Sequence, residues 1–335
     1  MLQKIKTWML PLAMLSGAFF YEFFQQLAFL TPYLIFSMLF ITYCKLSFRD
    51  LKFSGLHLWL LAVQVVGCLV VYGGLVWFDP VVAQGGLICV LAPTATAAAV
   101  ITGMLGGSVA CLAAYTLMSS LVVAVVSPLI FTLLGEHSDM TFWNSVLFIC
   151  RQVMPILILP FALALFLEKA LPSLHRQLKK LQILSFYLWA LGLTIVTGKT
   201  VYFIVYQENA DITEEWWMAA LALVICVLQF ILGRRIGRRY GDPVSGGQGL
   251  GQKNTILAIW MAQVYLNPLS SIAPASYVLW QNMINSWQLW KIRTEGYSIA
   301  LAAGTISSRA TFVVMMFFGP GIRGLFSNTW RTRLY

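Results

Sequence analysis

The sequence has few charged residues. Only 10% of its 335 residues are Asp, Glu, Lys or Arg, whereas 59% are hydrophobic. Soluble globular domains carry roughly a quarter charged residues, so this composition excludes a soluble protein. It predicts an integral membrane protein that is in contact with the lipid bilayer.

Clusters of residues that carry chemistry inside a membrane are also absent from the sequence. The six cysteines are scattered through apolar segments without metal-ligand spacing, and the three histidines lie near expected connections. None of the twelve carboxylates falls in the middle of an apolar run. A membrane enzyme needs a buried nucleophile, paired acids or metal ligands, so the sequence predicts no enzyme, no metal site and no cofactor.

Long apolar runs are plentiful. A transmembrane helix needs about 20 predominantly apolar residues, and ten segments meet this requirement: 7–24, 27–44, 57–78, 81–104, 108–134, 143–167, 183–206, 215–233, 245–266 and 269–290. The runs are continuously apolar and do not alternate, which favours helices over a barrel. The predicted fold class is therefore an all-α integral membrane protein with ten transmembrane helices.

The net charge of +10 has a topological explanation. Lys and Arg gather at the amino terminus and in the even-numbered connections, for example at Arg234, Arg235, Arg238 and Arg239, and none occurs in the odd-numbered connections. This is the positive-inside pattern. It predicts a multi-pass protein of the plasma (inner) membrane with its amino terminus in the cytoplasm, and it gives no reason to expect a nucleic-acid partner.

Two of the ten segments contain helix-breaking residues in corresponding places. The fourth has Gly85 and Gly86 before Pro93, and the ninth reads SGGQGLGQKN over residues 245–254. If residues 1–138 and 139–292 are two five-span repeats, the odd number of spans inverts the second relative to the first. Paired Gly/Pro interruptions in inverted repeats indicate the binding site of a secondary transporter. The alternative is that Gly and Pro, common in membrane helices, coincide here by chance.

The residues at these interruptions resemble the bile acid:sodium symporter family. The similar stretches are Pro93–Val100, Gly249–Asn254, Tyr115–Ser120 with Ser127-Pro128, Leu279–Asn282, and Gln64. The resemblance covers roughly residues 7–292. It implies a core of spans three to five and eight to ten, with crossed, broken helices four and nine, and a panel of spans one, two, six and seven that moves against the core.

The sequence departs from the family at the sodium ligands. The resemblance implies that sodium binds a Ser-Asn pair, a glutamate and a glutamine, and the matching positions here are Ala98, Ala99, Gly249 and Lys253. A methyl group cannot coordinate an ion, and an ammonium group about 4 Å from a cation would repel it by on the order of 4 kcal/mol at an effective dielectric near 20. We therefore expect the usual sodium sites to be lost.

Lys253 is the main candidate for an ion-substituting or coupling residue. Its ammonium group is expected to hold the crossed helices with help from a small polar set: Gln64, Asn254, Gln252, Thr116 and Ser119. Two roles stay open. Lys253 is either a permanently charged strut or a residue whose gain and loss of a proton is coupled to transport, because burial favours the neutral amine.

Two further basic residues lie inside predicted spans at a similar depth. Arg151 and Lys199 are candidates for attracting an anionic substrate, with the guanidinium as a bidentate donor. The alternative is that Arg151 pairs with Glu22 and Lys199 extends its amine toward the membrane surface. The remaining substrate-binding candidates are Thr94, Thr96, Gln281 and Asn282.

The sequence and the resemblance together predict a secondary active transporter of an organic anion, such as a bile-acid-like compound or another carboxylate or sulfate. Protons or sodium are the candidate coupling ions. The alternatives are a sodium-coupled symporter that uses the remaining ligands, a cation/proton antiporter-like carrier of the same architecture, and a receptor that binds without transport. Residues 293–335, with Arg309 inside an apolar run, are expected to form a cytoplasmic or interfacial extension.

Overall fold

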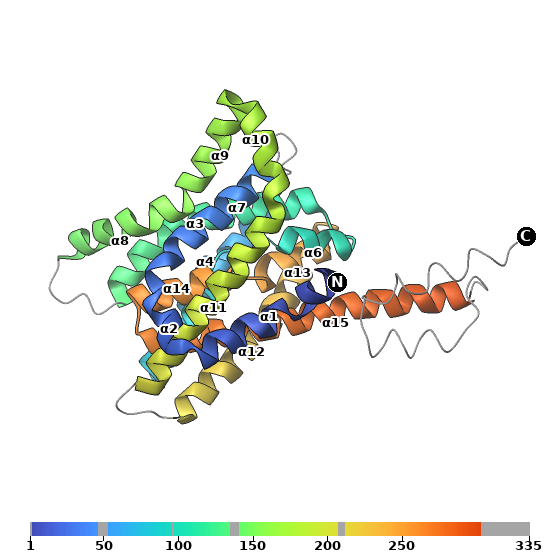
Figure 1. The fold of residues 1–335 in the computed structure, drawn as a ribbon. Coiled ribbons are helices and arrows are strands. Elements are labelled where there is room, and N and C mark those ends of the chain that lie inside the picture. The colour runs from blue at the N-terminus through green and yellow to red at the C-terminus, as the bar shows by residue number, and fades with distance from the viewer. Residues whose placement is uncertain (1, 46–52, 96, 135–140, 207–211, 303–335) are drawn as a thin grey trace, which may run out of the picture.

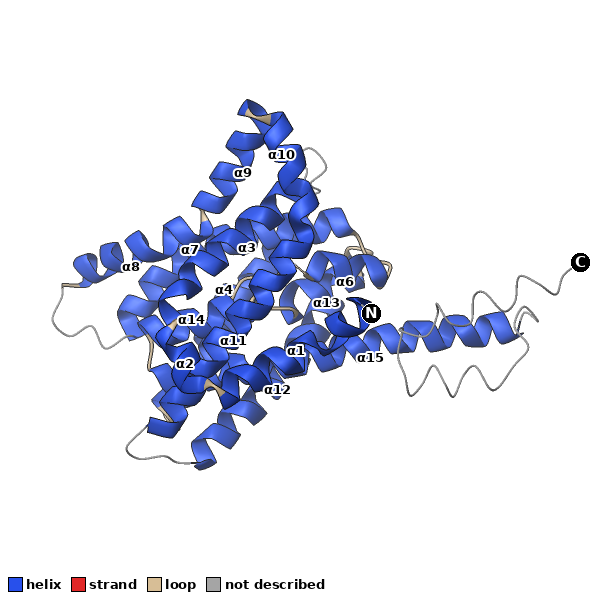
Figure 2. Ribbon diagram, viewed as in Figure 1, coloured by secondary structure: helices blue, strands red, loops and turns tan. Residues whose placement is uncertain are grey.

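The structure is a computed structural model that describes residues 2–45, 53–95, 97–134, 141–206 and 212–302. Helices joined by short loops make up this part of the chain, and no β-sheet occurs in it (Figures 1 and 2). The all-helical prediction is thus confirmed. Thr96 and most of the predicted carboxy-terminal extension lie outside the described residues.

The described residues of the first half of the chain form eight helical elements. Their bounds are α1 Leu2–Phe19, α2 Tyr21–Gln26, η1 Ala28–Leu30, α3 Thr31–Lys45, α4 Gly55–Leu75, α5 Pro80–Leu91, α6 Ala98–Met104 and α7 Val109–Leu134. The predicted fourth span is therefore two helices, α5 and α6, separated by a non-helical segment that contains Pro93.

The second half repeats this kind of interruption. Its elements are α8 Phe142–Leu157, α9 Leu159–Ala170, α10 Pro172–Leu178, η3 Lys179–Leu181, α11 Gln182–Tyr206, α12 Ile212–Arg239, α13 Pro243–Gly251, α14 Thr255–Tyr265, η4 Pro268–Ser271 and α15 Ile272–Ala302. The predicted ninth span is divided into α13 and α14. Helix α15 continues past residue 292, where the predicted extension begins, as far as Ala302, and Figure 1 shows it projecting beyond the other helices.

Five helical stretches of the described chain are long and apolar enough to cross a membrane: Gly55–Leu75, Val109–Leu134, Phe142–Ala170, Leu184–Tyr206 and Glu215–Arg239. Helix α4 shows why lipid suits them. Its polar residues His57 and Gln64 are buried, while Leu58, Val66 and Val70 are exposed. The chain is a multi-pass membrane protein. The count of ten spans stays a prediction, because the other predicted spans are helices that are shorter, interrupted or less apolar.

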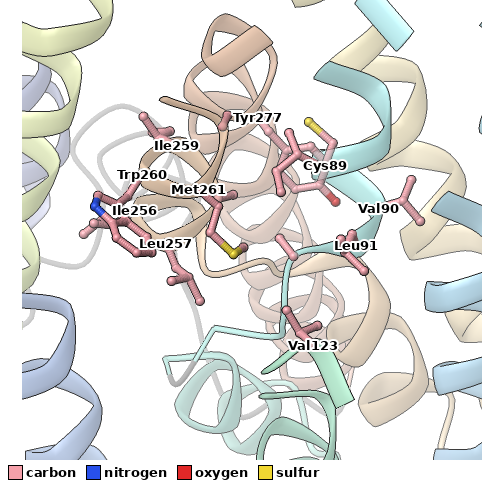
Figure 3. Packing of buried hydrophobic residues seen from close by; sticks show 14 of the residues in the cluster. Cys89, Val90, Leu91, Val123, Ile256, Leu257, Ile259, Trp260, Met261 and Tyr277 are labelled. Atoms are coloured by element: carbon pink, nitrogen blue, oxygen red, sulfur yellow. The ribbon is translucent and has the colours of Figure 1, made fainter. Parts of the chain in front are cut away.

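The helices pack in two groups. One contains α1, α2, α3, α9 and α11, which lie against one another in the pairs α1–α11, α2–α11, α3–α11 and α3–α9, together with α8, which packs on α3 and α9 and also on α7 of the other group. The other contains α4 to α7 and α12 to α15, in which α4 packs on α5 and α12 packs on α13. Figure 3 shows the apolar centre of the second group, where Leu91 of α5 and Leu257 and Met261 of α14 belong to one cluster of buried side chains.

Helices α12 and α13 approach unusually closely because glycines line both faces. A Cβ atom on Gly246 would collide with the carbonyl oxygen of Gly233, and a Cβ on Gly233 would collide with the carbonyl of Gly246. A Cβ on Gly251 would collide with the ring of Phe230. The glycines of the ninth predicted span therefore do more than weaken a helix, since they let α13 lie flat on its neighbour.

This contact predicts the effect of adding one methyl group. Gly246→Ala should lower the free energy of unfolding by about 1–3 kcal/mol, the usual cost of overpacking, because the obstacle is backbone that cannot turn away. Gly73→Ala in α4 is the matched control, because a Cβ there meets nothing within 4 Å. Unfolding of the purified protein in detergent should separate the two variants, and equal stability would contradict the tight contact.

Candidate functional site

Both broken helices begin with the same three residues. Asp79-Pro80-Val81 opens α5, and Asp242-Pro243-Val244 opens α13. Each aspartate accepts a hydrogen bond from a backbone N–H three residues later, from Val82 at 2.7 Å and from Ser245 at 2.9 Å. An aspartate N-cap followed by proline at the first helical position is a strong helix start. The sequence reasoning above missed this repeated tripeptide, which a direct comparison of the two segments reveals.

The two interruptions meet and satisfy each other's backbone. Thr94 and Lys253 form an antiparallel β-bridge. The N–H of Ala95 donates to the carbonyl of Gln252 at 2.9 Å, and the N–H of Asn254 donates to the carbonyl of Pro93 at 2.8 Å. Buried backbone groups need partners, so each non-helical segment supplies what the other lacks. We call Ala92–Ala95 together with Gln252–Asn254 the crossing.

Matching side chains from the following helices hold the two bridged residues. Ser119 of α7 accepts from the N–H of Thr94 at 3.3 Å. Gln281 of α15 accepts from the N–H of Lys253 at 2.8 Å and donates to its carbonyl at 3.3 Å. Helices α7 and α15 each come directly after a broken helix. In both halves, therefore, a polar side chain of the next long helix accepts a hydrogen bond from the N–H of the bridged residue.

Gln64 of α4 is the centre of a buried polar network. Its Nε2 donates to the carbonyls of Leu91 and Ala92, at 2.6 and 3.1 Å. Its Oε1 accepts from the hydroxyls of Tyr115 and Ser119, at 3.0 and 2.9 Å. One amide thus pairs the carbonyls that α5 leaves unsatisfied at its end and connects them to α7.

Lys253 completes the set of donors around the end of α5. Its side chain is 1% exposed, and Nζ donates to the carbonyl of Val90 at 2.7 Å. A cation at the carboxyl end of a helix interacts favourably with the helix dipole. The ammonium group therefore occupies a place suited to a small cation.

Three other predicted site residues, the substrate candidate Thr94 and the coupling candidates Asn254 and Thr116, have local roles. Thr94 Oγ1 donates to the carbonyl of Gly249 at 2.6 Å, and Asn254 caps α14 by accepting from Leu257 N at 3.4 Å. The hydroxyl of Thr116 donates to Leu112 of its own helix at 3.0 Å. The structure thus brings Gln64, Ser119, Lys253, Asn254 and the backbone of Gln252 together, and turns Thr116 toward its own helix.

The predicted anion ligands are more dispersed. Arg151 is exposed on α8, and Lys199 of α11 lies with Nζ 5.5 Å from the centre of the Phe203 ring. Glu22, the alternative partner of Arg151, accepts from the hydroxyl of Tyr206 at 3.0 Å. The half-buried Asn282 donates to the carbonyl of Val278 in its own helix at 2.6 Å. Of the predicted substrate residues, Thr94 and Gln281 are the two that the structure brings to the crossing.

Position 249 leaves little room for a larger residue. A Cβ on Gly249 would lie 3.0 Å from the ring of Tyr115 and 3.1 Å from Leu60 Cδ1. The resemblance places the family's glutamate here, and the Tyr115 ring fills that space instead. The sequence reasoning treated Tyr115 only as part of a motif and did not consider Tyr277, whose hydroxyl donates to the carbonyl of Gly251 at 2.9 Å. Tyrosines in apolar segments gave no signal that separates network members from packing residues.

A cavity of about 370 Å³ lies between the two helix groups. Its lining comes from α3, α8, α9 and α14 and consists of Pro32, Tyr33, Phe36, Gln152, Pro155, Ile156, Leu159 and Trp260. Tyr265 of α14 donates to Gln152 at 2.8 Å beside it. None of the predicted substrate residues is part of this lining, although Arg151 precedes Gln152. Among the described residues, no cluster of His, Cys, Asp or Glu is placed to hold a metal ion.

Comparison with known protein families shows to which family the chain belongs. The sodium bile acid symporter family matches residues 32–207, more than half of the chain. The chain belongs to this family. The members of the family are transporters, and the matched region of this member includes α5, Gln64 and Ser119. A search of curated proteins found no match.

The network predicts that Gln64 matters more than a typical buried amide. Gln64→Leu keeps the volume but removes four hydrogen bonds, and each such bond in a membrane protein contributes about 0.6 kcal/mol on average. We expect a loss of about 2 kcal/mol in the free energy of unfolding. Asn282→Leu is the control, since its amide bonds only within α15. Equal melting temperatures for the two variants in detergent would contradict the central role of Gln64.

Proposed function

We propose that this protein is a secondary active transporter of an organic anion that works by alternating access and uses Lys253 in place of the usual sodium ions. The observation that carries the proposal is the hydrogen bond from Lys253 Nζ to Val90 O inside the crossing. It is joined by membership of a transporter family. The substrate class, a bile-acid-like compound or another carboxylate or sulfate, comes from that family.

Replacement of an ion by an amine follows from the chemistry of the crossing. In transporters with interrupted helices, freed carbonyls and helix carboxyl ends coordinate the coupling cation. Here the carbonyls of Val90, Leu91 and Ala92 already receive hydrogen bonds from Lys253 and Gln64. A sodium ion would have to displace these donors and approach an ammonium group. The same carbonyls therefore favour a fixed positive charge on the protein.

The runner-up is a sodium-coupled symporter that uses the remaining oxygen ligands. Gln64 Oε1 accepts two hydroxyl hydrogen bonds, and Thr116 Oγ1 donates to its own helix. These oxygens are engaged with protein donors or acceptors, which disfavours sodium at this place. A cation/proton antiporter-like carrier uses intramembrane carboxylates, and the sequence places none in mid-membrane. A receptor would bind the same ligand but would not move it across the membrane, so only a flux measurement distinguishes it from a transporter.

We assign recognition of the anion to groups that form no hydrogen bonds within the crossing. Thr94 and Gln281 hold the crossing through their own hydrogen bonds. Arg151 and Lys199 supply positive charge, and the exposed Arg151 can form a bidentate pair with a carboxylate or sulfate. The amino end of α14 adds the favourable end of a helix dipole. Asn282 supplies a neutral polar contact.

The architecture proposed for this function has two inverted repeats, residues 1–138 and 139–292. It is supported by the twin Asp-Pro-Val starts and by the matching contacts of Ser119 and Gln281. The group of α4 to α7 and α12 to α15 is the core, and the group around α3 and α11 is the panel that moves against it. The basic connections place the amino terminus in the cytoplasm and the protein in the plasma (inner) membrane.

The ion requirement can be tested by ligand-induced stabilisation. A thermal-shift screen of the purified protein against organic acids, run in sodium and in choline buffers, should find a stabilising acid whose effect does not depend on sodium. Bound ligand stabilises by RT ln(1 + [L]/Kd), so a loss of sodium ligands leaves the shift unchanged between buffers. A shift that appears only in sodium would support the sodium-coupled alternative instead.

Removal of the amine should abolish transport. Lys253→Met keeps most of the volume but removes the donor to Val90 O, and uptake of the identified acid into proteoliposomes should fall to background. Lys291→Met, at an exposed lysine that lies over Trp287, is the matched control and should retain uptake. A pH dye trapped in the vesicles separates the two roles of Lys253: a signal during uptake indicates proton coupling, and a silent dye indicates a strut. Full uptake by Lys253→Met would refute both roles.

A further inference from the structure

A row of buried amides runs along α15 on one face. Gln281, Asn285 and Gln288 are spaced by four and three residues, so they share a side of the helix. All three are at most 6% exposed. Across from them on α13, Gln248 is 1% exposed and Gln252 follows one turn later at the crossing. We call these five residues the amide ladder.

The ladder begins at a basic surface and ends at the crossing. The half-buried Arg234 donates from Nη2 to Gln288 Oε1 at 2.9 Å. Gln248 Nε2 donates to the same oxygen at 3.2 Å and to Asn285 Oδ1 at 2.9 Å. Gln281, at the other end, holds the backbone of Lys253. The α12–α15 half of the core thus contains one hydrogen-bonded group around Gln248 and a second at the crossing, one helical turn of α15 apart.

Arg234 fixes which way each amide points. A guanidinium group donates but never accepts, so the atom of Gln288 that faces Arg234 must be the oxygen. That oxygen can accept from Gln248 only through Nε2, and Nε2 can then pair only with the oxygen of Asn285. The guanidinium group of Arg234, at the basic end of the ladder, therefore sets the orientations of Gln288, Gln248 and Asn285.

Three polar atoms of the ladder have no partner, and the fixed order accounts for two of them, Gln248 Oε1 and Asn285 Nδ2. Gln248 Oε1, Gln252 Oε1 and Asn285 Nδ2 are buried, and none of them has a hydrogen-bond partner in the structure. Two are acceptors and one is a donor, a mixture that water satisfies and that a cation does not. Arg234 nearby also repels a cation. Buried waters typically bind such unsatisfied groups with about three hydrogen bonds each.

We infer that the amide ladder is a hydrated lane, with ordered water bound at Gln248, Asn285 and Gln252, which brings solvent from the basic surface to the residue beside Lys253. The lane lies inside one helix group, between α13 and α15, whereas the substrate of the proposed function passes between the two groups. Water reaching the crossing is thus separated from the path of the anion. The inference requires only the hydrogen-bonding needs of these side chains.

The test is a high-resolution cryo-electron microscopy structure of the full chain in lipid nanodiscs. Density for water is expected within hydrogen-bonding distance, about 2.7–3.2 Å, of Gln248 Oε1 and of Asn285 Nδ2. Gln248→Met and Asn285→Leu each remove a ligand and should lose the nearest peak. Asn282→Leu, on another face of α15, is the matched control and should keep every peak.

Three results would overturn the inference. The first is a dry lane in which the unpartnered amide atoms pair with protein groups after all. The second is a peak that disappears when sodium is replaced by choline, which identifies a cation. The third is survival of the peaks in both ladder variants. The inference and the proposed function fail separately: a dry lane in a chain that takes up organic acids refutes only the lane, and ordered water in a chain without uptake refutes only the transporter.

Discussion

The organisation of this protein depends on the pairing of two interrupted helices at their non-helical segments. Lipid offers no hydrogen bonds, so irregular backbone at membrane depth is tolerated only when protein or trapped water satisfies it. The bridge between Thr94 and Lys253 does so reciprocally. Neither interruption is satisfied without the other, which explains why α5–α6 and α13–α14 pack at the centre of one group with α7 and α15 beside them.

One charged and one neutral side chain share the free carbonyls at the end of α5. Lys253 places one ammonium group on the carbonyl of Val90, while Gln64 supplies neutral donors to the next two carbonyls. Burial of a charge is tolerable when hydrogen bonds satisfy it, and the end of α5 provides suitable acceptors. The chain thereby satisfies the carbonyls at the end of α5 with its own side chains.

The sequence predicted those features of the site that a short stretch of residues reveals by itself. The glycines and Pro93 indicated both interruptions, Lys253 was recognised because charged groups are rare in apolar runs, and Gln64 came from the family resemblance. Long-range contacts gave no such signal: Tyr115 and Tyr277 look like packing residues until α7 and α15 are folded against the crossing. Asn285 and Gln248 were not singled out, because their partners lie on other helices far along the chain. The predicted sixth span lies within the helical stretch Phe142–Ala170, which has a turn at Ile158 that the sequence reasoning did not single out.

The packing around Gly249 has a consequence for how this protein can evolve. A residue larger than glycine at this position would have to move the ring of Tyr115, whose hydroxyl also binds Gln64. Substitution of Gly249 therefore disturbs the hydrogen-bond network around Gln64 as well as the packing, and a tolerated change needs a compensating change at Tyr115.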